Sequence, residues 1–186
     1  YCILSKINPN IKKAKTIPSE FYYSEKKFQE IKELLFAKQW QFICDTTKLQ
    51  NHGDAFPYSF IEDFIEDPLI LVNDNGEIKS MSNVCTHRGN ILIEESCNIK
   101  RGIMCRYHGR RFNTNGEFTF MPKCEELENF PSESDNLTQT PVQIWKQFVF
   151  SSINTKIPFQ ELVKDMDDRV GWMPIEKFTF SKTRSK

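Results

Sequence analysis

Two short motifs near the middle of the chain carry side chains that commonly bind metals. The first motif is Cys85-Thr86-His87-Arg88-Gly89, and the second is Cys105-Arg106-Tyr107-His108-Gly109. Each motif supplies one thiol and one imidazole, and seventeen residues lie between His87 and Cys105. Thiolates and neutral imidazoles are good ligands for transition metals, so this spacing predicts one four-ligand metal site assembled from two loops.

The order of the ligands bears on the kind of metal site. Zinc fingers usually take two cysteines from one loop and two histidines from the next element. Here each motif contributes one of each, which suits a two-iron cluster in which Cys85 and Cys105 ligate one iron while His87 and His108 ligate the other. The motifs therefore predict a Rieske [2Fe–2S] centre, with structural zinc as the alternative.

The two motifs resemble the cluster-binding motifs of the Rieske non-haem iron oxygenases of the ring-hydroxylating type, in particular the N-terminal domain of their α (oxygenase) subunits. The layout of residues from about 17 to 172 is similar as well, with an opening helix and strands on either side of the motifs. The chain differs at Arg110, where oxygenases often have a tryptophan. Asn90 and Tyr107 stand near the places where respiratory Rieske proteins carry extra cysteines, which favours the oxygenase or ferredoxin branch.

The resemblance implies a mainly β fold with Rieske-type stacked antiparallel sheets and an N-terminal α-helix. The cluster would be held by two hairpin-supported loops at about 84–112. We expect an extended arm over residues 1–16 and the Rieske domain over residues 17–180. Residues 181–186 would form a tail that leads into a catalytic domain absent from this chain.

Local patterns predict the elements that position the motifs. Ser24 can cap a helix that runs to about residue 38. Its apolar side chains recur at helical spacing and are expected to pack into the core: Phe28, Ile31, Leu34 and Leu35. Strands are expected at residues 40–46, 58–64, 69–72, 77–83 and 142–151, and a short helix at 159–167.

Two turns between these strands have strong hairpin signals. Asn75-Gly76 lies between the third and fourth predicted strands, and Asn115-Gly116 follows the second motif. These hairpins would support the two metal-binding loops. The acidic, turn-rich segment 125–135 is expected to be a surface loop.

The amino-acid composition limits the classes of protein to which the chain can belong. The chain has 186 residues, enough for one domain, and its 16 Phe, 3 Trp and 5 Tyr can supply an aromatic core. Lys+Arg 25 balances Asp+Glu 25, so no excess of positive charge points to nucleic acid. The longest aliphatic run is 69–72, far shorter than a membrane span. We therefore expect neither a nucleic-acid partner nor a membrane.

Six cysteines would allow disulfides, but two of them belong to the metal motifs. The other four lack a histidine at ligand spacing and are predicted to be free thiols, mostly packed as small apolar groups: Cys2, Cys44, Cys97 and Cys124. Free thiols persist in a reducing compartment, so the predicted location is the cytoplasm.

The number of histidines limits the chemistry. The resemblance to oxygenases implies a separate mononuclear Fe(II) site with two histidines and one carboxylate. The chain has 3 His, of which His52 lies alone in a turn-rich loop and is given no role. One spare histidine cannot build that site, so the catalytic iron is expected in the absent domain and no catalytic residue is assigned here.

The predicted function is one-electron transfer through a Rieske [2Fe–2S] cluster that serves as the electron-delivery domain of a Rieske mono- or dioxygenase, an oxidoreductase that hydroxylates an organic substrate with O2. The resemblance implies a reductase or ferredoxin as electron donor, the chain's own C-terminal catalytic domain as acceptor, and a homo-oligomer. The first alternative is a stand-alone Rieske ferredoxin. The second is a zinc-binding interaction module without a redox role.

Overall fold

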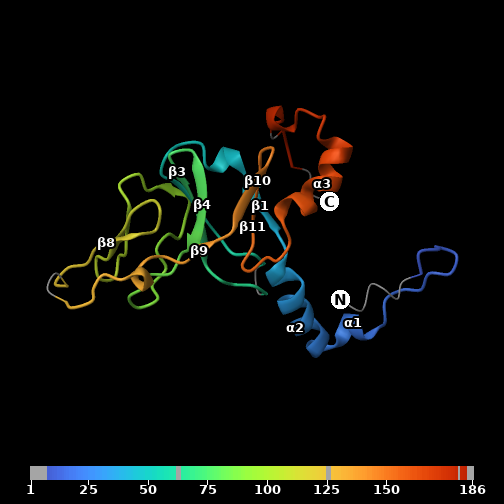
Figure 1. The fold of residues 1–186 in the computed structure, drawn as a ribbon, viewed down its shortest axis with the longest axis horizontal. Coiled ribbons are helices and arrows are strands. Elements are labelled where there is room, and N and C mark those ends of the chain that lie inside the picture. The colour runs from blue at the N-terminus through green and yellow to red at the C-terminus, as the bar shows by residue number, and fades with distance from the viewer. Residues whose placement is uncertain (1–7, 62–63, 125–126, 180, 184–186) are drawn as a thin grey trace.

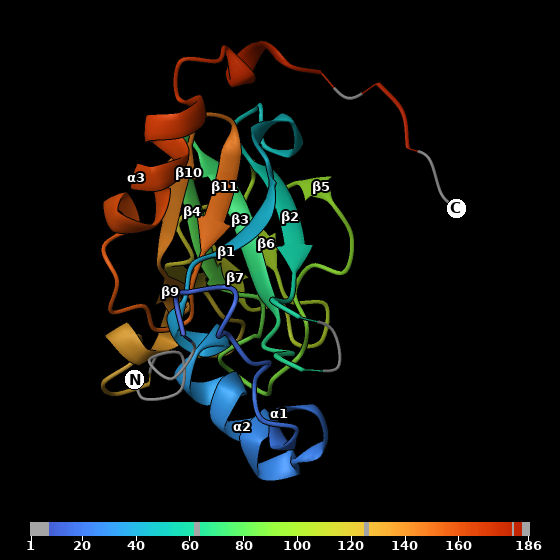
Figure 2. The ribbon, with the colours of Figure 1, turned by 90° about the vertical axis from the view of Figure 1, so that its right-hand side faces the viewer.

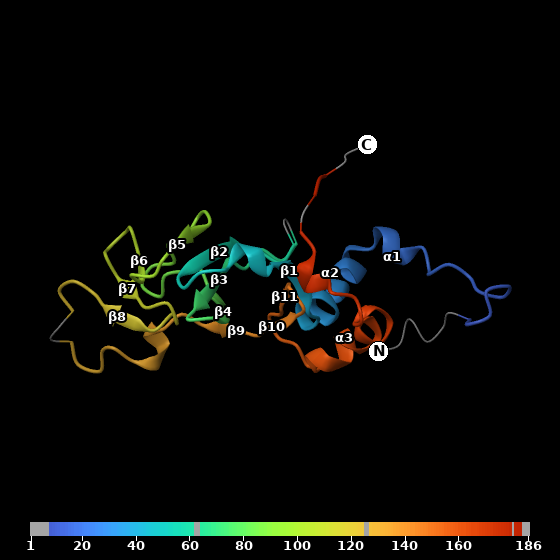
Figure 3. The ribbon, with the colours of Figure 1, turned by 90° about the horizontal axis from the view of Figure 1, so that it is seen from above.

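The computed structural model describes residues 8–61, 64–124, 127–179 and 181–183. Within these residues, three antiparallel sheets follow one another along the long axis (Figure 1). The sheet that contains β8 lies at the left, the sheet of β3 and β4 in the middle, and the sheet of β1 and β10 to its right, with helices beyond (Figure 3). The mainly β fold expected from the sequence is confirmed.

The middle sheet has five strands in the order β5-β2-β3-β4-β9. Its strands are β2 (Asp54–Tyr58), β3 (Leu69–Asp74), β4 (Glu77–Ser82), β5 (Cys97–Asn98) and β9 (Gln139–Thr140). The β3–β4 hairpin closes at Asn75 and Gly76, with φ of 53° and 95°. Both residues adopt the left-handed region that a type I′ turn requires, so the predicted Asn-Gly hairpin is confirmed.

The strand predicted at residues 58–64 is wrong in position. Strand β2 ends at Tyr58, where Tyr58 pairs with Leu69 at the start of β3. Residues 62 and 63 lie outside the described part, and Ile61 forms an isolated bridge with Ile65. Pairing with β3 determines where β2 ends, and no local sequence pattern predicts that end.

A second sheet consists of β1 (Gln41–Asp45), β10 (Val142–Trp145) and β11 (Phe148–Ser151), in the order β1-β11-β10. The single strand predicted at 142–151 is wrong, because the chain reverses between Trp145 and Phe148. Lys146 takes a φ of 57° in this turn. Neither turn residue is Gly or Asn, so the sequence lacks the usual hairpin signal here.

The third sheet, in the order β6-β7-β8, is made of strands of only two or three residues. Its strands are β6 (Ile103–Met104), β7 (Arg111–Phe112) and β8 (Phe118–Phe120). The connection between β7 and β8 contains the predicted Asn115-Gly116 turn, in which Gly116 has a φ of 78°. This hairpin follows the second motif, as expected.

Strand β3 lies between two hydrophobic cores. On one face, Ile70 and Val72 join a cluster that includes Met81 and both motif cysteines. On the other face, Leu71 packs with residues of β1 and β11, among them Cys44 and Val149. Ile70, Leu71 and Val72 are each 0% exposed. The uninterrupted apolar run of this strand therefore reflects burial on both faces.

Helices flank the sheets. The α-helices are α1 (Glu20–Tyr23), α2 (Glu25–Leu34) and α3 (Phe159–Val170). Short 3₁₀ helices lie at η2 (Phe36–Lys38), η3 (Thr46–Lys48), η4 (Glu133–Asp135) and η5 (Ile175–Lys177). Helix α3 confirms the helix predicted at 159–167 and packs beside the β10–β11 hairpin (Figure 2). No helix of the described residues is long and apolar enough to span a bilayer.

Helix α2 partly differs from expectation. The Ser24 side chain accepts a hydrogen bond from the Lys27 amide, so the predicted N-cap is confirmed. The predicted core packing of its apolar stripe is wrong, because Leu34 is 61% exposed and Phe28 and Leu35 are each 47% exposed. The helix projects from the sheets (Figure 1), and Phe28 packs against Phe64. Helical periodicity predicts which face of helix α2 is apolar, but it does not predict which elements cover that face.

Parts of two predicted segments lie outside the described residues. Of the predicted arm 1–16, residues 1–7 are not described, and residues 8–16 have turns without a helix or strand. Of the predicted tail 181–186, residues 184–186 are not described. The domain boundaries stay predictions.

A network of hydroxyl groups links the middle sheet to the β1-β11-β10 sheet. The Tyr58 hydroxyl lies 2.7 Å from Ser80 Oγ of β4 and donates to Ser151 Oγ of β11 at 2.9 Å. Ser80 also lies 2.6 Å from Thr140 Oγ1 of β9. Burial raises the pKa of Tyr58, against the effect of these hydrogen bonds. The phenol therefore stays protonated and can donate.

Replacing Tyr58 with Phe is expected to destabilise the fold by about 1–3 kcal/mol, because buried Ser80 and Ser151 lose a hydrogen-bond partner. Urea unfolding followed by circular dichroism measures the change. Tyr22→Phe is the matched control, since Tyr22 is 74% exposed, and it should shift stability by less than about 0.5 kcal/mol. Equal effects of the two substitutions would contradict a role for the network.

Candidate metal centre

The two motifs fold into loops with the same backbone hydrogen bonds. We define the first ligand loop as residues 84–91 and the second as residues 104–111. The residue before each cysteine pairs with the residue six positions after that cysteine, as Val84 with Ile91 and Met104 with Arg111. Both loops thus leave and re-enter a short antiparallel pair, which fixes their ends.

Two further hydrogen bonds close each loop. Each cysteine amide donates to the carbonyl five residues later at 2.8 Å, Cys85 to Asn90 and Cys105 to Arg110. Each motif glycine donates back to the carbonyl of its cysteine at 3.0 Å. Gly89 and Gly109 have φ of 69° and 74°, a conformation that favours glycine. The motif glycines are therefore required by the turn itself.

The histidines occupy different positions on these equivalent backbones. His87 comes two residues after Cys85, whereas His108 comes three residues after Cys105. Their rings nevertheless meet, with centroids 4.8 Å apart and an interplanar angle of 76°. Tyr107 stacks on His108 with centroids 3.8 Å apart, which restrains the orientation of that imidazole.

The cysteines form the buried side of the site. Cys85 and Cys105 are each 2% exposed, and they pack in the same hydrophobic cluster. Burial raises the pKa of Cys85, and the adjacent Cys105 adds to this effect. A buried pair of thiols is deprotonated readily only when a cation compensates the charge, as a metal does.

The histidines form the outer side. His87 is exposed. Partial desolvation is the main cause that lowers the pKa of His87, and the neighbouring His108 lowers it further. A lowered pKa keeps the imidazole neutral, the form that binds metals. The Nδ1 atom of His108 is buried and has no hydrogen-bond partner among the described residues. A metal bond would satisfy this otherwise unpaired nitrogen.

The four side chains gather as two pairs, one of thiols and one of imidazoles. Among the residues that the structure describes, no three His, Cys, Asp or Glu side chains meet as ligands of one ion. A [2Fe–2S] cluster of the Rieske type needs two cysteines at one iron and two histidines at the other. The donor types, their pairing and the unpaired His108 nitrogen all fit such a cluster.

Asn83 supports the first ligand loop and was missed by sequence reasoning. It is 3% exposed and lies two residues before Cys85. Its side-chain amide donates to the Ile93 carbonyl at 2.7 Å and accepts from the Ile93 amide at 2.9 Å. Asn83 therefore ties the start of the loop to the segment that follows it. An asparagine before the first motif carries no pattern that would have revealed this role.

Arg110 and Asp135 support the second ligand loop and were also missed. Arg110 is 4% exposed and its Nη2 donates to Asp135 Oδ1. The surface loop predicted at 125–135 is thus wrong at Asp135, which is partly buried by this ion pair, while residues 125 and 126 lie outside the described part. Ser132 and Asp135 form a capping box at η4, whose spacing is visible in the sequence.

The third histidine lies apart from the site. The Nδ1 atom of His52 accepts from the Asn75 amide at 3.1 Å, in the turn between β3 and β4. His52 therefore helps to close a hairpin turn.

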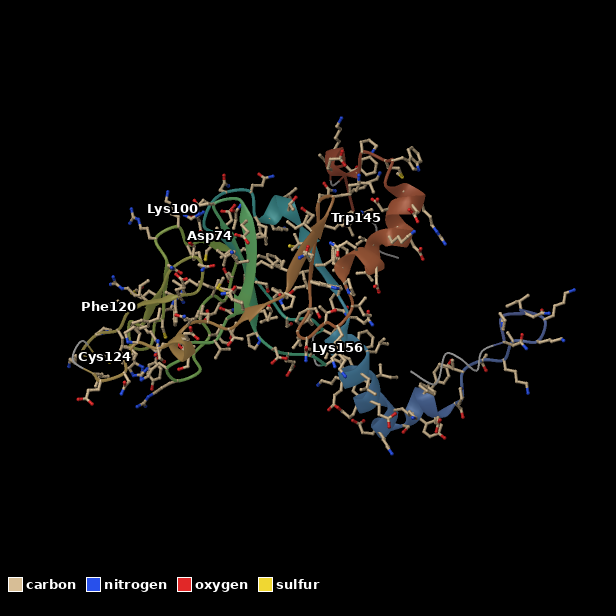
Figure 4. All side chains as sticks on the ribbon, in the orientation of Figure 1. Asp74, Lys100, Phe120, Cys124, Trp145 and Lys156 are labelled. Atoms are coloured by element: carbon tan, nitrogen blue, oxygen red, sulfur yellow. The ribbon has the colours of Figure 1, made fainter. Side chains whose placement is uncertain are left out.

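The remaining described cysteines are free, as predicted, but they pack differently from one another. Cys44 is buried in a core and Cys124 is intermediate, whereas Cys97 is exposed and is the exception among the described thiols that were predicted to be mostly packed. Cys124 lies at the same end of the molecule as Phe120 and Lys100, far from Trp145 and Lys156 (Figure 4). Cys2 lies outside the described residues.

Comparison with protein families gives one match that includes both motifs. Residues 39–131 match the Rieske [2Fe-2S] domain. The matched segment runs from just before β1 to just before η4, and it contains both ligand loops.

Curated relatives are oxygenase components. The carnitine monooxygenase oxygenase subunit of Escherichia coli is 30% identical over 146 residues, which cover 78% of this chain and 38% of that protein. The naphthalene 1,2-dioxygenase large oxygenase component of Pseudomonas aeruginosa is 27% identical and is covered over 32% of its length, with 80% of this chain aligned. The chain therefore spans about a third of the length of these relatives.

Solved structures agree with these relatives. The quaternary ammonium Rieske monooxygenase CntA in its apo form superposes with a TM-score of 0.77 at 25% identity, covering 85% of this chain and 46% of that one. A naphthalene 1,2-dioxygenase bound to phenanthrene gives a TM-score of 0.73 at 25% identity, with 84% and 35% covered.

Replacing Asn83 with Ala is expected to destabilise the first ligand loop, because the amide and carbonyl of Ile93 lose their partners at about 1–3 kcal/mol each. Hydrogen exchange at the Ile93 amide and urea unfolding would measure the loss. Asn90→Ala in the same loop is the control, since the Asn90 side chain bonds to the adjacent Ile91 carbonyl alone among described groups. A loss in the control as large as in Asn83→Ala would contradict this account.

Proposed function

The chain belongs to the Rieske [2Fe-2S] domain family, and from this we propose that Cys85 and Cys105 ligate one iron of the cluster while His87 and His108 ligate the other. The observation that carries the assignment is the meeting of the two ligand loops, which share one backbone hydrogen-bond pattern and bring the thiols and the imidazoles together in separate pairs.

The bound cluster supplies a reversible one-electron couple. The protein side chains determine which side of the cluster would be exposed to solvent. The buried cysteines keep water from one side, whereas exposed His87 places an imidazole edge at the surface. Neutral imidazoles in place of thiolates also leave less negative charge at the site, which favours the reduced form. Electron entry or exit at the histidine side follows from this exposure.

We further propose that the protein is the electron-delivery part of a Rieske oxygenase α subunit. The match to a monooxygenase structure covers 85% of this chain, well beyond the segment 39–131 that matches the domain family. The flanking regions are thus shared with an oxygenase, which supports this role over a stand-alone Rieske ferredoxin. Mono- and dioxygenase components both match, and the delivery of an electron is common to both.

The remaining parts of the system are proposals of the same kind. The chain has 3 His, of which two are assigned to the cluster, so a mononuclear Fe(II) site with two histidine ligands belongs to a C-terminal catalytic domain outside this chain. A reductase or ferredoxin would donate the electron, and the full-length protein would be a homo-oligomer. Free thiols at Cys44, Cys97 and Cys124 are consistent with the cytoplasm.

Metal analysis and spectroscopy of the purified protein test the assignment. We expect two irons and two sulfides per chain, visible absorption, and an EPR signal of the reduced form. His108→Ala is expected to abolish or grossly distort these spectra, because it removes one of the two imidazole ligands. His52→Ala is the matched control and should leave them unchanged, since His52 serves a hairpin turn.

Two results would reject the proposal. Stoichiometric zinc with no iron in the wild-type protein would favour a structural zinc module. Loss of the spectra in His52→Ala, with retention in His108→Ala, would overturn the choice of ligands.

A further inference from the structure

A buried arginine lies directly after the second motif. The side chain of Arg110 is 5% exposed, an unusual position for a permanently charged group. Three phenylalanine rings surround its guanidinium, with distances from Cζ to the ring centroids of 5.8 Å for Phe112, 4.9 Å for Phe118 and 5.6 Å for Phe130. Such a cage favours the cation by cation–π contact and excludes water that would screen it.

The charge of Arg110 has one partner in the described part of the chain. Its Nη2 donates to Asp135 Oδ1 at 2.5 Å and to the Asp135 carbonyl at 3.3 Å. Burial works to raise the pKa of Asp135, but hydrogen bonds from Ser132 and Arg110 lower it overall. Asp135 is therefore a carboxylate at neutral pH, and the two residues form an ion pair at the edge of the site.

This ion pair contacts both ligand loops. The Arg110 carbonyl accepts from the Cys105 amide at 2.8 Å, so Arg110 is part of the second loop. The Asp135 carbonyl accepts from the Thr86 hydroxyl of the first loop at 2.8 Å. The ion pair therefore bridges the second ligand loop, of which Arg110 is part, and the first, which Asp135 contacts through Thr86.

We propose that Arg110 and Asp135 form a charge pair that tunes the reduction potential of the cluster while it fixes the two ligand loops against each other. The inference rests on the proposed [2Fe–2S] cluster. Reduction adds one negative charge at the site, so the nearby guanidinium stabilises the reduced form and the carboxylate opposes it. Both are positioning residues, since neither is a ligand.

Because the two charges are opposite, removing each in turn is expected to shift the midpoint potential in opposite directions. A purely structural role would not produce this difference. Arg110→Gln leaves the Asp135 carboxylate without its cation, and Asp135→Asn leaves the guanidinium without its anion. The first change is expected to lower the midpoint potential and the second to raise it. Loosening of the loops alone would move both variants in the same direction.

The experiment is a redox titration of the purified, cluster-loaded protein, followed by visible absorption and by EPR of the reduced form. Each single variant is expected to shift the equilibrium between the oxidised and reduced forms about tenfold, which is about 59 mV for one electron. The double variant Arg110→Gln/Asp135→Asn should return close to the wild-type potential. Phe130→Leu is the uncharged control, which disturbs the cage and should shift the equilibrium between the oxidised and reduced forms by less than about threefold.

Shifts of the same sign in the two single variants, or no shift in either, would overturn the inference. If Arg110→Gln fails to hold the cluster, Asp135→Asn decides alone, with an upward shift in support and any other result against. A wild-type protein without an iron–sulfur spectrum would instead reject the proposed function, so the two failures are distinguishable.

Discussion

The packing of the two ligand loops against each other is the constraint on which the site depends. Neither loop alone holds a pair of like ligands, because each contributes one cysteine and one histidine. The thiol pair and the imidazole pair form only when both loops take the same closed shape and meet. Rigid placement of ligands is what cluster binding requires. The short strand pairs at the loop ends, and Asn83 and Asp135 beside them, all serve that placement.

Features with a local cause could be predicted from the sequence. The Ser24 cap, the Asn75-Gly76 turn and the helix after Pro158 each depend on neighbouring residues, and the structure contains all of them. The four candidate ligands were also visible, because the donor types and their order are chemical signals in themselves. In the structure the two histidine rings meet and the two cysteines pack in one cluster, while His52 bonds to the β3–β4 turn; the choice of the four as cluster ligands stays a prediction.

Features with a distant cause could not be predicted. The ion pair of Arg110 with Asp135 joins residues 25 positions apart, and nothing near Asp135 in the sequence marks it as the partner of Arg110. The end of strand β2 depends on where β3 begins, and the exposure of Leu34 depends on which elements cover helix α2. The position of Arg110 was noted as a departure from the oxygenase pattern, but its phenylalanine cage appears only in three dimensions.

Strand β3 contributes to both hydrophobic cores, and it therefore links the unfolding of the two larger sheets. Because Leu71 packs on one side while Ile70 and Val72 pack on the other, neither core can be exposed without losing the same strand. We expect the two larger sheets to unfold together as one cooperative unit. The β6-β7-β8 sheet has strands of two or three residues, but its Ile103 and Phe112 pack in the same cluster as Ile70 and Val72, so its core side is exposed only when that cluster opens. The second ligand loop, which leaves and re-enters this small sheet, therefore keeps its shape as long as the cluster around strand β3 stays closed.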